Sequence, residues 1–68
     1  MEYLFTATYN GIEARLVFQS FALCVQARKV LRAKGVHCGE VQTSFRPIER
    51  SPQELEAATK FVAFALQH

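Results

Sequence analysis

The Asn10-Gly11 pair, set between two stretches of alternating residues, constrains the fold of this chain most strongly. Asn-Gly is a strong hairpin signal, because a two-residue type I′ turn needs positive φ at both of its central positions. The flanking stretches, residues 2–9 (EYLFTATY) and 12–19 (IEARLVFQ), both alternate with the period of two that is typical of strands. The sequence therefore predicts an antiparallel β-hairpin over residues 2–19.

A two-residue turn also determines which residues face each other across the hairpin. On one face every cross-strand pair is apolar: Tyr9 with Ile12, Ala7 with Ala14, Phe5 with Leu16 and Tyr3 with Phe18. The other face is mixed: Thr8 with Glu13, Thr6 with Arg15, Leu4 with Val17 and Glu2 with Gln19. Because one register sorts both strands in this way, we expect the first face to be buried.

The stretch 20–35 (SFALCVQARKVLRAKG) predicts an amphipathic helix. It opens on Ser20, a residue type that caps helix N-termini, and closes on Gly35, a type that ends helices. At about 100° per residue one arc should face the core. Its members are Leu23, Cys24, Ala27, Val30 and Leu31.

Two further elements complete the predicted fold. After a connection over 36–39, residues 40–46 (EVQTSFR) alternate as a strand with Val41, Thr43 and Phe45 inward. The Ser51-Pro52 start predicts a helix over 52–66. Its core arc is expected to hold Leu55, Ala58, Val62, Ala65 and Leu66. The expected fold is α+β in one domain, residues 1–68: a three-stranded antiparallel sheet in ββαβα order, strand order 2-1-3, with both helices on one face.

The apolar content suggests that this small chain covers a second surface. Half of its 68 residues are hydrophobic, yet a chain of this length buries only about 60% of its unfolded surface. Ala57, Phe61 and Phe64 widen the apolar arc of helix 52–66. One interpretation is that these residues fill the chain's own core; the other, which we favour, is a homodimer formed through them.

The helix over 20–35 holds half of the chain's eight basic residues and is the candidate binding site. The proposed binding residues are Phe21, Val25, Arg28, Lys29, Arg32, Lys34 and Arg46. They suggest a binding or regulatory module for an anionic partner, nucleic acid or nucleoprotein, although a net charge of +2 is mild for that role. The alternatives are a solvated helix face, or a protein-binding inhibitor or adaptor. The chain's size would suit a phage or mobile-element protein.

Other functions find little support in the sequence. Cys24, His37, Cys38 and His68 lack the paired spacing of a zinc site, and no nucleophile stands beside an oriented base, so we expect no metal, no cofactor and no catalysis. No apolar run approaches the ~20 residues of a membrane span. The N-terminus lacks a signal-peptide pattern, and two cysteines are expected as reduced thiols in a cytoplasm.

Overall fold

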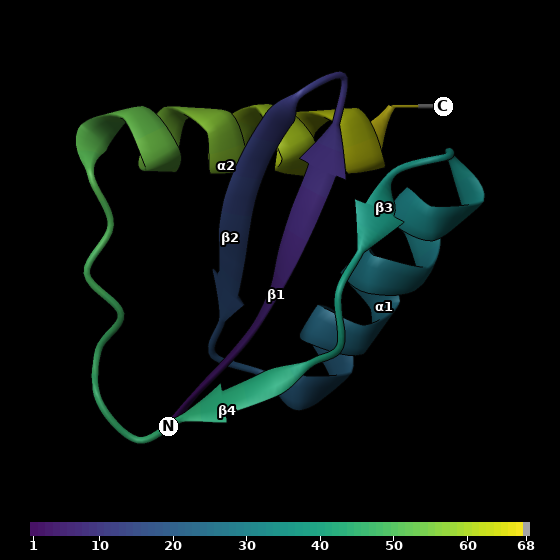
Figure 1. Ribbon diagram of the computed structural model, residues 1–68. Coiled ribbons are helices and arrows are strands. Elements are labelled where there is room, and N and C mark those ends of the chain that lie inside the picture. The colour runs from purple at the N-terminus through teal and green to yellow at the C-terminus, as the bar shows by residue number, and fades with distance from the viewer. Residues whose placement is uncertain (68) are drawn as a thin grey trace.

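The computed structural model describes residues 1–67 and places two helices on one face of an antiparallel sheet (Figure 1). In chain order the elements are β1 (Glu2–Tyr9), β2 (Ile12–Phe18), α1 (Phe21–Ala33), β3 (His37–Cys38), β4 (Gln42–Ser44) and α2 (Pro52–Leu66). The central strand is β1, which pairs with β2 on one side and with β3 and β4 on the other. This arrangement confirms the predicted α+β class and the predicted strand order.

The hairpin has the predicted turn and register. Asn10 and Gly11 both have positive φ, 52° and 77°, and β1 and β2 pair from Tyr9 opposite Ile12 to Tyr3 opposite Phe18. The face expected to be buried is buried at Phe5, Ala7, Ala14 and Leu16. Turn chemistry and burial therefore specify the same pairing.

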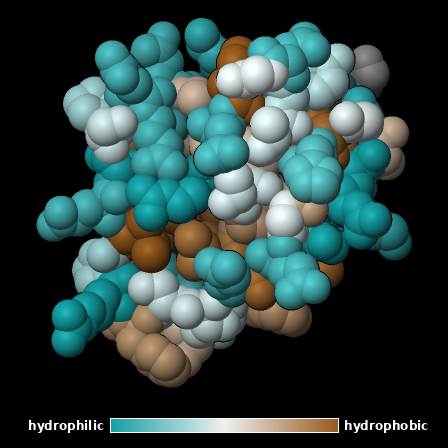
Figure 2. Space-filling view, viewed as in Figure 1, coloured by the Kyte–Doolittle hydropathy of each residue, from teal (hydrophilic) through white to brown (hydrophobic). Residues whose placement is uncertain are grey.

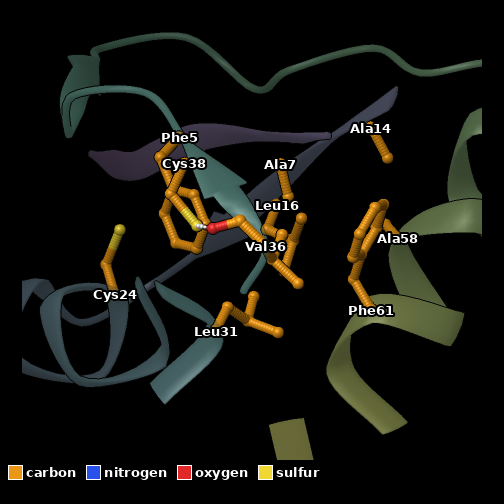
Figure 3. Close-up of a cluster of buried hydrophobic side chains, with 10 residues drawn as sticks. All are labelled: Phe5, Ala7, Ala14, Leu16, Cys24, Leu31, Val36, Cys38, Ala58 and Phe61. Atoms are coloured by element: carbon orange, nitrogen blue, oxygen red, sulfur yellow. Dashed lines mark hydrogen bonds between the residues drawn. The ribbon is translucent and has the colours of Figure 1, made fainter. Parts of the chain in front are cut away.

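The hydrophobic core lies between this face of the hairpin and the two helices (Figure 3). Its members come from every element except β4: Phe5, Ala7, Ala14, Leu16, Cys24, Leu31, Val36, Cys38, Ala58 and Phe61. Figure 3 shows Ala58 and Phe61 pointing from α2 toward the sheet. The Cys38 thiol donates a hydrogen bond to the Val36 carbonyl at 3.7 Å. The core is thus apolar apart from two thiols.

The third strand differs from the prediction of one strand over 40–46. It begins earlier, at His37, and is broken into β3 and β4 around Gly39. The Gly39 N–H still bonds the Thr6 carbonyl of β1 at 2.9 Å, but its own carbonyl accepts from the Arg28 side chain. This contact from α1 lies within residues 36–39, which the sequence predicted to be a connection.

The prediction that Thr43 and Phe45 point inward is also wrong. Thr43 is exposed, and Phe45, with 82% of its surface exposed, lies beyond the end of β4. The Ser44 hydroxyl donates to the Arg46 carbonyl and accepts from the Arg46 N–H, which turns the chain away from the sheet after Ser44. Val41 does pack against the core as expected.

Both helices begin at the predicted caps. Ser20 Oγ accepts from the Leu23 N–H at the start of α1, and Ser51 Oγ accepts from the Glu54 N–H at the start of α2. At the other end of α1 the backbone turns at Gly35, whose φ is 89°. These local signals were sufficient to place the helix starts.

The helices are rotated relative to the predicted core arcs. In α1, Cys24 and Leu31 are buried, but Leu23 is 59% exposed. In α2 the side facing the sheet is centred on Ala58 and Phe61. The residues wrongly expected in the core of α2 are Leu55, Val62 and Leu66, all of which are exposed. The reason is that Phe61, the largest buried side chain of α2, occupies the space over the hairpin.

The start of α2 is tied to the free edge of β2 by two charged side chains. Glu54 accepts from the Arg15 backbone N–H at 3.2 Å and from the Arg15 guanidinium at 2.8 and 2.9 Å. Arg50 donates to the Arg15 carbonyl at 2.8 Å. Both backbone groups of Arg15 at this edge are therefore satisfied, which protects β2 from pairing with another strand. The hydrogen bond from Arg15 holds the pKa of Glu54 well down, at about 2.

Replacing Gly11 with Val should lower the free energy of unfolding by about 1–3 kcal/mol, because a β-branched residue is strained at positive φ. Crowding is not the cause, since no atom lies within 4 Å of a Cβ built at Gly11. Asn10→Gly is the matched control and should be nearly neutral. Urea unfolding measures both, and equal stabilities would contradict the type I′ turn.

Replacing Glu54 with Gln should reduce stability at neutral pH by roughly 1–2 kcal/mol, the scale of a partly exposed charge-assisted contact. Because the folded pKa is lowered from 4.5 to about 2, the wild type should lose this contribution as pH falls from about 4.5 toward 2. The variant should lose less stability over that range. Glu56→Gln removes only the exposed ion pair with Lys60, in which Nζ and Oε1 are 3.9 Å apart, and this variant should behave like wild type. Identical acid unfolding of the Glu54 variant and wild type would refute the contact.

Candidate functional site

One exposed side of α1 carries most of the residues predicted to bind a partner. We call Phe21, Val25, Arg28, Lys29 and Arg32 the basic flank. Four of them lie within about 60° of one another around the helix, and Lys29 extends the flank outward. Arg28 is half-buried, and the other four residues are exposed. The structure thus brings these five predicted residues together on one surface.

Arg28 is held in place by the broken strand. Its Nε donates to the Gly39 carbonyl at 2.6 Å, which leaves both terminal amino groups of the guanidinium available. Within residues 1–67 neither those amino groups nor the head groups of Lys29 and Arg32 form an ion pair. The basic flank therefore carries one cation that is held by a hydrogen bond, Arg28, and two that form no ion pair, Lys29 and Arg32.

The aromatic member of the basic flank is also positioned by the fold. Phe21 meets Tyr3 of β1 edge to face, with 5.5 Å between the ring centroids. Its ring is nevertheless more exposed than buried. Val25 lies one turn further along the helix and is exposed as well. The flank therefore combines apolar contact area with positive charge.

Lys34 does not belong to the basic flank. Its ammonium group donates to the carbonyls of Phe64 and Gln67 and lies 5.0 Å from the centre of the Phe64 ring. The last turn of α2 has no basic residue of its own, so Lys34 supplies the charge that suits this helix end. The prediction that Lys34 binds an external partner is untested, and its ammonium is engaged within the chain.

The remaining arginines lie elsewhere. Arg46 is exposed and lies beyond the end of β4, outside α1. Arg15 and Arg50 lie at the β2 edge, on the other side of the sheet from β3, and both bond within the chain. Arg15 and Arg50 are therefore separate from the basic flank, and Arg46 belongs to a different segment of the chain.

The residues predicted to form a dimer interface are largely engaged within the chain. Phe61 is only 6% exposed and fills the core, so its placement at an interface is wrong. Phe64 is half-buried between Tyr9, at 5.9 Å between ring centroids, and Lys34. Ala57 is half-buried against the core. The apolar arc expected to face a second copy is the arc that packs on the hairpin.

Sequence reasoning missed an apolar groove between α1 and α2. The groove has a volume of about 270 Å³. Its lining comprises Leu16, Phe18, Leu23, Gln26, Ala27, Val30, Leu31, Val62, Ala65 and Leu66. The only sign of this groove in the sequence was the unusual width of the apolar arc on residues 52–66. The width did not show which residues of that arc would stay exposed.

The chemistry-bearing residues outside the basic flank are poorly placed for reaction. Burial raises the pKa of the Cys24 and Cys38 thiols, and the nearby charge of Arg28 offsets this only in part. Within the described residues no three His, Cys, Asp or Glu side chains gather as they would around a metal ion. His68, a ligand considered from the sequence, lies outside the described residues.

The open face of the sheet is the other large surface of the molecule. Figure 2 shows hydrophilic and neutral residues over most of this side, with a limited hydrophobic area. On this face Leu4 pairs with Val17; Leu4 is buried and Val17 is half-buried. The Arg15 side chain, which also lies on this face, is bonded to Glu54. This face therefore offers fewer free cations than the basic flank.

No protein-family model, curated protein or solved structure matches this chain. In the described part of the chain neither helix is long and apolar enough to cross a membrane.

Replacing Lys34 with Met should lower the free energy of unfolding by about 1 kcal/mol, because the C-terminal carbonyls of α2 lose their cation. Lys29→Met removes the same charge from the basic flank and should change stability by less than about 0.5 kcal/mol. Thermal unfolding of both variants tests the assignment. A stable Lys34 variant would return that residue to the set of candidate binding residues.

Proposed function

We propose that this protein is a non-enzymatic binding module that engages an anionic partner, nucleic acid or nucleoprotein, through the basic flank of α1. One observation carries the proposal. Arg28, Lys29 and Arg32 present three cations within two helical turns, and no carboxylate among residues 1–67 is ion-paired with them. Arg15, Lys34 and Arg50, in contrast, bond within the chain.

The geometry of these side chains suits phosphate groups. Arg28 is anchored through Nε, so its terminal amino groups can bind an oxyanion with little further ordering. Lys29 and Arg32 add charge on either side, and the exposed Phe21 ring offers a surface on which an unpaired base can stack. These features favour flexible or single-stranded nucleic acid over a rigid duplex.

A protein-binding inhibitor or adaptor is the second candidate. It is favoured by the exposed Phe21 and Val25 beside two arginines, since aromatic and Arg side chains are typical anchors of protein interfaces. Such a contact would be mainly apolar and would depend little on salt. Salt dependence therefore separates the two candidates.

The proposal includes a cytoplasmic location and the absence of catalysis. Both cysteines are free and buried, as is usual for thiols of reducing compartments. Their raised pKa values make them weak nucleophiles at neutral pH.

Binding of a fluorescent single-stranded oligonucleotide, followed by anisotropy between 50 and 200 mM salt, tests the proposal. With three cations at the surface, log K should fall with log salt with a slope of about −2. Arg32→Glu should weaken binding at least tenfold, because a cation becomes an anion on the flank. Lys60→Glu makes the same charge change on α2 and should bind nearly as wild type does.

Three results would count against the proposal. Absence of oligonucleotide binding by the wild type would remove the anionic partner. Equal losses in the Arg32 and Lys60 variants would show an effect of net charge alone. A partner found later that binds through Phe21 with no salt dependence would support the inhibitor or adaptor.

A further inference from the structure

A stripe of four residues on α2 has the spacing of a helix-pairing seam. Leu55, Thr59, Val62 and Leu66 follow one another at intervals of four, three and four, which is the a/d pattern of a coiled coil. We call these residues the α2 seam. They lie about a quarter turn around the helix from Ala58 and Phe61, which face the core. The seam therefore faces sideways from α2, where Leu16 and Phe18 of β2 line the same hollows.

The α2 seam is apolar and open. Leu55, Val62 and Leu66 are 45%, 39% and 73% exposed. Thr59 is exposed too, but its hydroxyl already donates to the Leu55 carbonyl at 2.9 Å, so it can be covered without leaving an unpaired donor. Val62 and Leu66 border the groove between α1 and α2, which no charged residue lines. Leu55, Thr59 and Val62 border a second hollow, which Arg50 also lines.

The total surface of the chain is larger than a monomer of its size should expose. The surface is 4904 Å², against about 4,300 Å² expected for a monomeric protein of 7.7 kDa. An expanded fold is not the cause, since the radius of gyration of 11.0 Å equals the value of about 11 Å for a compact chain of this length. The excess of the observed surface over the surface expected for a monomer approaches the ~800 Å² that each partner buries in a standard interface.

The α2 seam is complementary to itself. Its spacing reads the same in both directions, so an antiparallel copy places Leu55 against Leu66 of the second copy, and Thr59 against Val62 of the second copy. The side chains that flank the seam are small at Ala65 on one side and at Ala63, next to Glu56, on the other, which allows close approach. Antiparallel pairing brings Glu56 near Ala63 of the second copy, so no carboxylate is placed opposite another.

We propose that two copies of this chain form a two-fold dimer in which the α2 seams pack antiparallel and cover the groove between α1 and α2. The interface differs from the one predicted from the sequence, since it uses the exposed arc of α2 in place of the arc that holds Phe61. It also leaves the basic flank open, because Arg28 and Arg32 lie on the side of α1 opposite the groove-lining Leu23 and Val30. The inference does not depend on the proposed function.

Analytical ultracentrifugation of the full chain tests the dimer. The wild type should sediment as a species of about 15 kDa, twice the 7.7 kDa of one chain. Val62→Glu should give a monomer that keeps its helical circular dichroism, because the substituted side chain is exposed in the monomer. Gln53→Glu, on the far side of α2, should remain dimeric. A wild type that is monomeric at high concentration, or a dimeric Val62 variant, would overturn the proposal.

A charge pair tests the antiparallel register. Leu55→Glu alone should dissociate the dimer, since it buries a carboxylate against Leu66. Leu55→Glu combined with Leu66→Lys should restore dimerisation, because the two substituted positions then face each other twice with opposite charge. Failure of the double variant to dimerise while the wild type does would overturn the antiparallel arrangement.

Discussion

The register of the β1–β2 hairpin is the constraint on which the rest of the structure depends. Asn10 and Gly11 supply the positive φ angles of the turn, and that turn places Phe5 opposite Leu16 and Ala7 opposite Ala14. Both helices then pack on this apolar face, and β1 pairs with β3 and β4 at its other edge. A slip of one residue would turn the whole apolar set outward and leave neither helix a surface to cover.

Charged side chains then decide how α2 lies on that face. Its start is bonded to Arg15 on β2 through Glu54, and its end is bonded to Lys34, the residue that follows α1. With both ends held, Phe61 faces the core and Leu66 faces solvent. These cations serve the fold, whereas Arg28, Lys29 and Arg32 form no ion pair among residues 1–67 and are the cations that we propose for the binding surface.

Local signals predicted the hairpin, both helix starts and the fold class, because a turn or a cap is specified by neighbouring residues. They could not predict how α2 is rotated about its own axis. Since α2 is apolar over most of its circumference, several rotations would each bury apolar side chains against the sheet. Long-range bonds were equally hidden. Nothing near Lys34 in the sequence indicates that its partner is the carbonyl of Phe64, and nothing near Gly39 indicates that its carbonyl accepts a hydrogen bond from Arg28. The basic flank was predictable because its residues share one helix.

An amide chemical-shift map of the protein titrated with a single-stranded oligonucleotide tests the central claim most directly. The claim is that binding and self-association use opposite sides of α1. Binding through the basic flank predicts shifts at Phe21, Val25, Arg28 and Arg32, and at Gly39, whose carbonyl holds Arg28. The α2 seam should be unaffected. Shifts concentrated on the open face of the sheet, around Arg15 and Val17, would contradict the claim.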